Sequence, residues 1–573
     1  MNKKWKINDT QTDIAEKIAN EFNISRLVAN IIANKGLKDK KEIETFLNPT
    51  RKDFYDPFLM PDMEKAIERI VKAINDKEKI TIYGDYDVDG ITSSTVLSRF
   101  LEERGVKPDI YIPDRINEGY GLNQNAIKSI AENKTNLIIT VDCGITAVKE
   151  VEFAKELNMD IVITDHHEPG TEIPNTIAVV DCKRKDNKYP FSELAGVGVA
   201  FKLTQALSMK MGLPEESYLK YLDIVCIGTI SDIVPLVSEN RTIAKLGLKL
   251  VKQTKNVGLR CLLASIGYKK IDSNTISFGI APRVNACGRM GQARKALDLF
   301  LTNNIEQARK LTDELNECNV KRQEIEKRIS DEAIKMLENP EEQNAPCIIL
   351  GKENWHHGVI GIVSSKITDM YSKPSILLCF EDEKAKGSGR SIPGFDLHEA
   401  LENCNRYIEQ FGGHSMAIGI TIQKDNFQKF KDDIEEYAKS KNISEIVPEI
   451  QVDEKIQLQD ISIKDVEELS LLEPFGEGNR VPLFQISGVK ISSIRALSEG
   501  KHLKLFLKDD NKFIDAIGFN MGSVVDKYTI EDKIDLVGGL ELNSYNGTEK
   551  MQINLKDIRH SIWLGGETKC LKI

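Results

Sequence analysis

The sequence has no run of about eighteen apolar residues, the length that a helix needs to cross a bilayer. Residues 1–6 (MNKKWK) lead into a charged, helix-patterned segment and lack the apolar core of a signal peptide. The ten cysteines include no Cys-x-x-Cys pair, which argues against a zinc ribbon and against a disulfide framework. We therefore expect a cytoplasmic protein without a membrane partner, whose cysteines are reduced and mostly buried.

Basic residues are in deficit overall, and the formal net charge is −10. The deficit is not uniform, because the stretch from Arg241 to Phe300 holds twelve Lys and Arg against two acids, a local net charge of +10. Lys245, Lys249 and Lys252 fall at helical spacing, which is typical of a solvated helix face. The scarcity of acids favours instead a contact with a polyanion such as nucleic acid.

A chain of 573 residues should hold several domains, because single hydrophobic cores rarely grow beyond about 250 to 300 residues. Apolar strands alternate with helical patterns in its first half, which predicts a doubly wound parallel sheet of the α/β class. The expected strands are 80–84, 109–112, 137–142, 160–164 and 176–180. The predicted segments are a helical segment (1–60), the α/β domain (61–240), a basic helical region ending in a long connecting helix (241–340), a second α/β domain (341–445), a β-barrel (446–563) and a tail (564–573).

Acidic and imidazole side chains follow three of these strands. Asp85, Asp87 and Asp89 come directly after the first strand at alternate positions, and an extended run would direct alternate side chains to one spot. Asp142 ends another strand, and an Asp-His-His run at 165–167 ends a third. The carboxyl ends of parallel strands meet at one edge, where such sheets bind ligands. The pattern therefore predicts a divalent-metal site.

Each motif taken singly is also compatible with a simpler role. Asp-x-Asp-x-Asp-Gly opens an EF-hand calcium loop as well, but the twelfth position is Val96 rather than Glu, and a strand precedes the loop. Asp142 alone could be a helix N-cap, and the adjacent histidines could belong to a polar turn. Their coincidence at three strand ends favours the metal site.

Four motifs resemble, in order, those of the DHH phosphoesterase family. They are Asp85 to Gly90, Val141 to Gly144, Asp165 to His167, and Gly228 to Leu236. Further segments resemble the single-strand-specific DNA exonucleases of that family, namely 112–121, 279–289, 355–362, 387–391 and 411–419. The chain departs from that pattern at Asp181-Cys182, where Asn-Pro is expected, at His357, where Pro is expected, and at Ile418, where Ala is expected. These departures concern loop shape rather than metal ligands.

The resemblance implies a metal-dependent 5′-to-3′ exonuclease that degrades single-stranded DNA to 5′-mononucleotides in DNA repair and recombination. Mixed carboxylate and imidazole ligands suit one or two ions of Mn²⁺ or Mg²⁺. The implied catalytic residues are Asp85, Asp87, Asp89, Asp142, His166, His167 and Asp232. The metal ligands among them are Asp87, Asp89, Asp142, His166 and Asp232, the last selected over Asp223 by the motif. Asp85 and His167 would orient the phosphate or hold a second ion.

Contacts to nucleic acid are expected in two places. Glycine lets backbone N–H groups approach a phosphate, and arginine adds a forked donor. The residues expected around a terminal phosphate are Arg115, Arg283, Arg289, Ser388, Arg390, Ser391, Gly413 and His414. In the barrel, strand alternation places His502, Lys504 and Phe506 on one face opposite three leucines, as in OB-folds that bind single strands. A barrel used only for packing between domains is the alternative.

Single-stranded DNA is therefore the expected partner, and the resemblance adds a helicase and a single-strand-binding protein. No heptad seam stands out, so we expect a monomer. Two competing functions stay open. One is a DHH hydrolase for oligoribonucleotides, cyclic dinucleotides or pyrophosphate, which would leave the basic region and the barrel without a purpose. The second is a scaffold that has lost its metals. Every proposed ligand is intact in the sequence, which argues against that function.

Overall fold

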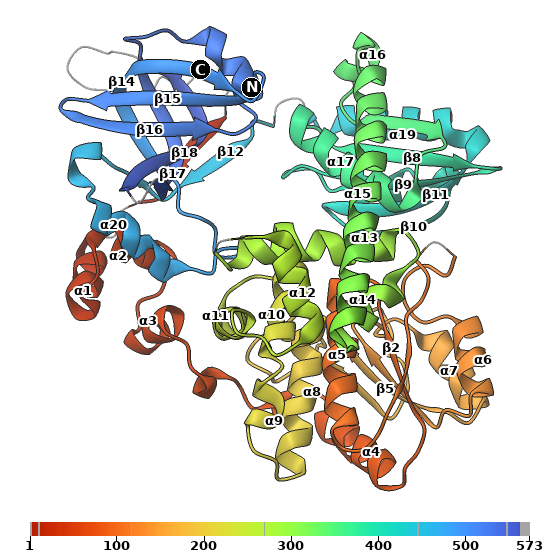
Figure 1. Ribbon diagram of the computed structural model, residues 1–573. Coiled ribbons are helices and arrows are strands. Elements are labelled where there is room, and N and C mark those ends of the chain that lie inside the picture. Colours follow the sequence, from red (N-terminus) through yellow and green to blue (C-terminus); the bar gives the residue numbers. More distant parts are fainter. Residues whose placement is uncertain are drawn as a thin grey trace. The chain divides into compact units, whose positions relative to one another are not determined.

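The computed structural model describes residues 3–9, 12–115, 117–268, 270–443, 446–545 and 548–561, so the expected tail lies outside the described residues. The chain forms two compact units (Figure 1). One, here the central unit, is Arg51–Ile446; the other, here the terminal unit, joins Met1–Thr50 to Val447–Ile573. No helix within the described ranges is both long and apolar enough to span a bilayer. All the described cysteines are free, and each except Cys261 is buried, as expected.

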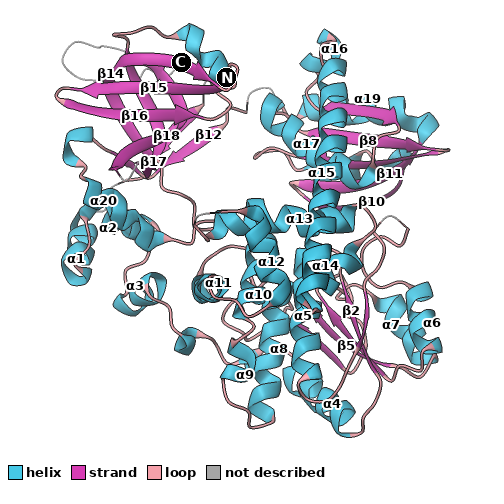
Figure 2. Ribbon diagram, viewed as in Figure 1, coloured by secondary structure: helices cyan, strands magenta, loops and turns pink. Residues whose placement is uncertain are grey.

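The first sheet of the central unit is parallel, with strand order β3-β2-β4-β5-β6. The strands are β2 (Ile80–Gly84), β3 (Asp109–Tyr111), β4 (Leu137–Val141), β5 (Asp160–Asp165) and β6 (Ala178–Asp181). Alternate residues enter opposite cores: Ile82 faces one cluster and Tyr83 the other. Helices cover both faces (Figure 2), which confirms the doubly wound α/β architecture.

Two layers of helices flank this sheet. On one face lie α4 (Met63–Asn75), α5 (Val88–Glu102) and α8 (Gly196–Lys210), and on the other lie α6 (Gln124–Glu132) and α7 (Val148–Glu156). Smaller helical elements are η1 (Arg51–Asp53), η2 (Pro57–Leu59) and α9 (Glu216–Leu219). The carboxyl ends of β2, β4 and β5 therefore open at one edge of the sheet, next to the N-termini of α5 and α8.

The basic region folds onto the same core as the first sheet. Its helices are α10 (Leu222–Ser231), α11 (Ser238–Val251), α12 (Val257–Ile266), the π-helix η3 (Thr275–Ile280), α13 (Ala281–Arg289) and α14 (Ala293–Leu301). Ile243, Leu259 and Phe300 are buried in one cluster with Ile82. The connecting helix α15 (Ile305–Met336) has 32 residues and confirms the long helix expected at the end of region 241–340.

The second sheet of the central unit is mixed, with order β10-β11-β9-β8-β7, and only β7 and β8 are parallel. Its strands are β7 (Ile348–Glu353), β8 (Ser375–Glu381), β9 (Lys384–Arg390), β10 (Ile408–His414) and β11 (Ala417–Gln423). One face packs on α15 and α17 (His357–Tyr371), and the other packs on α18 (Leu397–Asn403) and α19 (Phe427–Ser440). The short elements are α16 (Pro340–Asn344), η4 (Asn405–Tyr407) and η5 (Lys424–Asn426).

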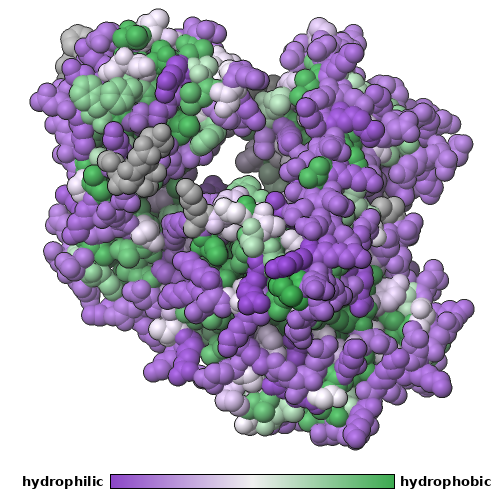
Figure 3. Space-filling view, in the orientation of Figure 1, coloured by the Kyte–Doolittle hydropathy of each residue, from purple (hydrophilic) through white to green (hydrophobic). Residues whose placement is uncertain are grey.

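The terminal unit contains a closed barrel. Strands β14 (Phe484–Leu497), β15 (His502–Asp509), β16 (Lys512–Gly518), β17 (Lys533–Tyr545) and β18 (Thr548–His560) pair in the order β14-β15-β16-β18-β17, and β17 pairs back to β14. Leu503, Leu505 and Leu507 are fully buried, so the alternation expected for this strand is confirmed. Figure 3 shows apolar patches among hydrophilic residues on the surface of the barrel. The barrel matches the OB-fold expectation.

The N-terminal helices complete the core of this barrel, which the sequence did not predict. They are α1 (Thr12–Phe22), α2 (Arg26–Asn34) and α3 (Lys40–Leu47). Ile31 and Ile32 of α2 share a cluster with Phe484 of β14. The strand β1 (Lys4–Ile7) pairs in parallel with β12 (Glu449–Val452). The remaining elements are β13 (Glu454–Lys455), η7 (Leu458–Asp460), α20 (Ile463–Glu468), η8 (Leu469–Leu472) and η9 (Gly522–Lys527).

A buried ion pair fastens α8 to α11 in the central unit. The Lys202 ammonium lies 2.8 Å from Glu239 Oε1, and both side chains are inaccessible to solvent. The Tyr189 hydroxyl and the Tyr55 N–H also donate to Glu239. Burial lowers the pKa of Lys202, and the attraction of Glu239 opposes that shift. Each charge therefore depends on the other to remain in the core.

Glu239→Gln should destabilise the protein by about 3 kcal/mol, because it leaves a buried ammonium facing a neutral amide. Lys202→Met/Glu239→Gln should be less destabilised than Glu239→Gln, because no buried charge remains while an acceptor for Tyr55 and Tyr189 is kept. The measurement is the urea-unfolding midpoint by circular dichroism. Glu152→Gln, in the exposed Lys155–Glu152 pair, is the control and should change stability by less than about 0.5 kcal/mol. Equal effects of Glu239→Gln and Glu152→Gln would contradict the assigned role.

Candidate metal centre

The loop after β2 and the first turn of α5 present three carboxylates at the edge of the sheet, because the loop folds tightly onto the start of the helix. A Cβ at Gly90 would lie 2.5 Å from the backbone nitrogen of Asp85, so only glycine allows this approach. Asp87 is the N-cap of α5, and its Oδ1 accepts the N–H groups of Asp89 and Gly90 at 2.9 and 3.1 Å. Asp85 and Asp89 are buried. The turn therefore places three acids at the head of one helix.

A second helix fixes the orientation of Asp89. Its two carboxylate oxygens accept the N–H groups of Gly196 and Val197, each at 2.7 Å, from the first turn of α8. A Cβ at Gly228 would collide with Thr92 Oγ1, so the glycine lets α10 approach α5 closely. That approach brings Asp232, the residue after α10, to the same place. Two helix N-termini and one helix C-terminus thus meet at the acids.

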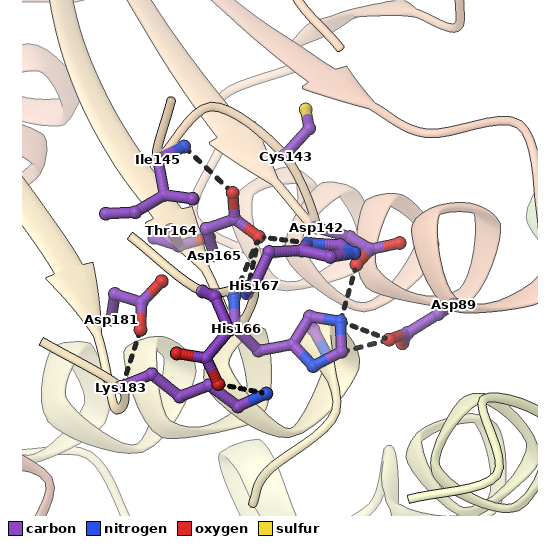
Figure 4. A network of polar contacts seen from close by, with 12 residues as sticks. Asp89, Asp142, Cys143, Ile145, Thr164, Asp165, His166, His167, Asp181 and Lys183 are labelled. Carbon is purple, nitrogen blue, oxygen red and sulfur yellow. Dashed lines mark hydrogen bonds and ion pairs between the residues drawn. The ribbon is translucent and has the colours of Figure 1, made fainter. Parts of the chain in front are cut away.

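His166 lies at the centre of the group (Figure 4). Its Nδ1 lies 3.0 Å from the carbonyl oxygen of Leu194, which can only accept, so Nδ1 carries the proton and Nε2 carries a lone pair. Nε2 lies 3.1 Å from Asp142 Oδ1, 3.7 Å from Asp232 Oδ2 and 3.8 Å from Asp89 Oδ2. Neither His166 Nε2 nor Asp142 Oδ1 has a hydrogen-bond partner among the described residues, although both are buried. Such opposed lone pairs call for a cation between them.

The electrostatics agree with this arrangement. Burial raises the pKa values of these carboxylates, and the charge of neighbouring carboxylates raises them further. The pKa values of Asp85, Asp142 and Asp232 lie well above the ordinary value for aspartate, and the pKa of Asp89 is raised to about 7. Burial also lowers the pKa of His166 to about 3, which keeps the imidazole neutral. These carboxylates can all be ionised together only if positive charge is supplied among them.

The residues fit a divalent cation. Three groups each offer ligand atoms within 4.8 Å of one another: Asp89, His166 and Asp232; Asp142, His166 and His167; and Asp85, Asp87 and Asp142. Every member of the predicted catalytic set belongs to one of them. Asp142 and His166 each belong to two groups, so the three groups overlap in one continuous cluster. Carboxylate oxygens with one or two imidazoles suit Mn²⁺, and the carboxylate-only group suits Mg²⁺.

His167 has two partners that the sequence analysis did not identify. Its Nδ1 donates to Asp165 Oδ1 at 2.7 Å, and Asp165 is fully buried. Burial alone would lower the pKa of His167, but the hydrogen bond to Asp165 and that residue's charge raise it above its ordinary value. The Tyr120 hydroxyl lies 3.0 Å from the same nitrogen and donates to the Asp142 carbonyl. Asp165 and Tyr120 thus orient His167. Both lie inside segments that resemble the family, and this position was the sequence signal from which they could have been predicted.

A second group in the central unit consists of arginines. Arg289 donates to the carbonyl of Gly358, and Arg390 donates to Gly389 O and to Ser388 Oγ. Burial, and then the charges of Arg115, Arg322 and Arg390, lower the pKa of Arg289 to about 10. Arg322 was not singled out by the sequence, and it pairs with Glu326 on α15. Repulsion among these guanidinium groups would be relieved by an anion.

The remaining residues expected near a phosphate have different surroundings. The Ser391 hydroxyl is buried and donates to Phe395 O, and Arg283 donates to Asn316 Oδ1 and Gly279 O. Arg283 therefore joins α13 to α15. Gly413 has φ +127°, and a Cβ there would collide with Ala417 O, so the β10–β11 turn requires glycine. His414 is exposed at the end of β10. The structure thus groups Arg115, Arg289, Ser388 and Arg390, and leaves Arg283 and Ser391 in packing roles.

In the terminal unit the outer face of the barrel carries stacked aromatic rings. Phe506 and Phe513 lie 5.4 Å apart at an interplanar angle of 11°, and they are 40% and 50% exposed. Phe519 packs edge-on against His502 and is 52% exposed. Lys504 pairs with Asp515. Phe513 and Phe519 were not predicted from the sequence, because the cross-strand register that places them beside β15 cannot be derived from one strand alone.

Family models match three segments of the chain. The DHH family N-terminal domain matches residues 79–229, the DHHA1 domain matches 344–440, and the RecJ OB domain matches 452–557. The class of protein is therefore the DHH phosphoesterases, as the motifs indicated.

Individual relatives narrow the class. The single-stranded-DNA-specific exonuclease RecJ of Bacillus subtilis is 39% identical over 566 residues, which cover 98% of this chain and 71% of that protein. RecJ of Thermus thermophilus is 33% identical over 515 residues, covering 89% and 73%. The crystal structure of Thermus thermophilus RecJ in complex with Mn²⁺ matches with a TM-score of 0.86 at 29% identity, covering 98% of this chain and 80% of that one. The chain belongs to the RecJ family of single-stranded-DNA-specific exonucleases.

Gly196→Ala should weaken Mn²⁺ binding at least about tenfold, since supporting groups around metal ligands typically contribute that much. An added Cβ would lie 2.6 Å from Asp142 Oδ1 and would push apart the two aspartates that flank α8. Isothermal titration calorimetry with Mn²⁺ measures the effect. Gly170→Ala is the control, because its Cβ meets nothing closer than 3.7 Å. Unchanged affinity in Gly196→Ala would mean that Asp142 does not contribute to metal binding.

Proposed function

We propose that this protein is a divalent-metal-dependent exonuclease that degrades single-stranded DNA from the 5′ end to 5′-mononucleotides. The observation that carries the proposal is the pair of buried, unpartnered acceptors, Asp142 Oδ1 and His166 Nε2, which lie 3.1 Å apart among further carboxylates. Membership of the RecJ family supplies the substrate class. It also favours this function over the small-substrate hydrolase and the metal-free scaffold.

Asp87, Asp89, Asp142, His166 and Asp232 are the proposed metal ligands. Bound Mn²⁺ or Mg²⁺ would lower the pKa of a coordinated water and neutralise charge on the phosphate that is attacked. The protein's part is orientation: α8 holds Asp89 through two N–H groups, and the Leu194 carbonyl holds His166 in the tautomer whose Nε2 can coordinate. No side chain needs to act as a covalent nucleophile.

Asp85 and His167 are proposed to act on the phosphate side of the cluster. Asp165 keeps His167 in a fixed orientation and favours its protonated form, which can donate a hydrogen bond to a phosphate or to a leaving oxygen. Asp85 belongs to the carboxylate group with Asp87 and Asp142, so it is suited to a second ion. His167 is partly exposed, which gives a substrate access to its ring.

The arginine group is proposed to bind the terminal 5′-phosphate. Arg115 links it to the acids, because the charge of Arg115 acts on Asp85 as well as on Arg289 and Arg390. Arg115 also stacks over Tyr86, with 5.0 Å from its guanidinium carbon to the ring centroid. An anionic end held here would place the next phosphodiester towards the metal ligands. The 5′ direction itself rests on the family resemblance.

The barrel is proposed to bind the strand through bases stacked on Phe506, Phe513 and Phe519, with His502 and Lys504 alongside. Base–aromatic stacking contributes about 1 to 3 kcal/mol per base and tolerates any sequence. The OB-domain match supports this use over a purely structural barrel. A cytoplasmic monomer that works with a helicase and a single-strand-binding protein in repair and recombination completes the proposal.

Asp232→Asn should lower hydrolysis of single-stranded DNA with Mn²⁺ by at least about 100-fold while binding of the strand in a chelator is kept, because a metal ligand is removed without loss of volume. The assay labels each end of the DNA in turn and identifies the first small product. Asp223→Asn, at the other end of α10 and hydrogen-bonded to Thr254, should stay within about threefold of the wild type. Near-wild-type turnover of Asp232→Asn would remove Asp232 from the site. Release of mononucleotides first from the 3′ label would reverse the proposed polarity.

Arg390→Met should raise KM for 5′-phosphorylated single strands about tenfold or more, because a charge-assisted hydrogen bond to phosphate contributes about 1.5 to 3 kcal/mol. The same variant should change KM for 5′-hydroxyl strands much less, since no terminal phosphate is present. Arg406→Met, at an exposed arginine of the same α/β domain, is the control. Equal losses on both kinds of strand would place Arg390 elsewhere than at the terminal phosphate.

A further inference from the structure

Ile233, the residue after Asp232, combines backbone strain with exposure. Its φ is +63°, in the left-handed region, where β-branched residues are strongly disfavoured. The other non-glycine residues with positive φ in the described ranges are Asn, Asp, Ser, Lys and Glu, so Ile233 is the one apolar member. Its side chain is 70% exposed, so burial of the side chain does not offset the free-energy cost of the strained backbone.

The segment around Ile233 is anchored on both sides. The Asp232 N–H donates to Gly228 O at 2.9 Å, which closes the last turn of α10. Asn240 donates to Pro235 O at 3.1 Å, and Leu236 is buried. The backbone at 233 is therefore held by its neighbours in a conformation in which glycine or asparagine would be relaxed.

Ile233 directly follows Asp232 in the chain, so it lies next to the metal centre. Of the carboxylates that face His166, those of Asp89 and Asp142 are 1% and 3% exposed, whereas that of Asp232 is 23% exposed. Asp232 is therefore accessible to a substrate from solvent, as is the partly exposed His167. The exposed apolar side chain of the next residue would be adjacent to a nucleotide whose phosphate enters beside Asp232.

We infer that Ile233 is a positioning residue that packs against a nucleobase beside the scissile phosphate. The strained backbone directs a branched apolar side chain to the entrance, where it contributes contact area only when DNA is bound. The inference rests on the proposed function and adds a contact that holds the base, whereas the metal ligands and the arginines hold phosphates. Apolar contact of this size commonly changes specificity about tenfold.

The test compares Ile233→Gly with Ile233→Val and with Lys134→Gly. Val keeps the branched side chain, and Lys134 is an exposed residue with φ +60° at the end of α6. Ile233→Gly should melt at or above the wild-type temperature, because strain is relieved. Its kcat/KM on single-stranded DNA should fall about tenfold, mostly through KM, whereas Ile233→Val and Lys134→Gly should stay within about twofold of the wild type.

A substrate that lacks the first two bases gives the decisive readout. On this substrate the kcat/KM of the wild type should be about tenfold lower than on normal DNA. The kcat/KM of Ile233→Gly should differ little between the two substrates, because the contact is already absent in the variant. Anisotropy of a short labelled strand in a chelator should show the same pattern without turnover. Two outcomes would overturn the inference. One is a kcat/KM of Ile233→Gly on normal DNA equal to that of the wild type, and the other is a further tenfold loss of kcat/KM by Ile233→Gly on abasic DNA. A wild type that cleaves no single-stranded DNA would instead overturn the proposed function, and the anisotropy comparison would still test Ile233.

Discussion

Buried negative charge is the constraint on which the rest of this structure depends. Asp85, Asp89 and Asp142 are almost inaccessible to solvent, and burial raises the pKa of each. The charge of Asp87 raises the pKa of Asp85 and Asp89 further, and the charges of Asp89, Asp87 and Asp85 raise that of Asp142. Backbone N–H groups at the heads of α5 and α8 offset part of this cost. The remainder calls for cations, and the neutral His166 nitrogen is oriented to share them. The glycines at 90, 196 and 228 follow from this arrangement of acids, because the acids meet only if three helices approach closely and a larger residue would prevent that approach.

The arginine group is the complement of this cluster. One site gathers carboxylates, and the other gathers guanidinium groups. Arg115 lies within electrostatic reach of both, so the loop after β3 joins them. A chain with a phosphate at its end and phosphodiesters along its length would satisfy both proposed sites, because its terminal charge would suit the arginines and its backbone would suit carboxylates that hold a metal ion.

Much of this could be predicted from the sequence because strand alternation and motif order are local. The strands of the first sheet begin and end within about two residues of their expected limits, and all seven predicted catalytic residues lie in the three groups whose ligand atoms could hold a metal ion. The packing of α1 to α3 into the barrel core could not be predicted, because the partners are more than 400 residues apart in the chain. Arg283 and Ser391 matched the expected pattern, yet their donors are used within the fold.

Residue types and their places at strand ends are enough to predict the class of site, since carboxylates and imidazoles at the ends of parallel strands have few other uses. Which of their atoms are available depends on the tertiary structure. The proton on His166 Nδ1, the Asp165–His167 contact, the stacking of Phe513 on Phe506 and the left-handed backbone of Ile233 all depend on neighbours distant in the chain or on anchors at both sides. Residue type and spacing specify which groups can meet, whereas packing specifies their orientation and protonation.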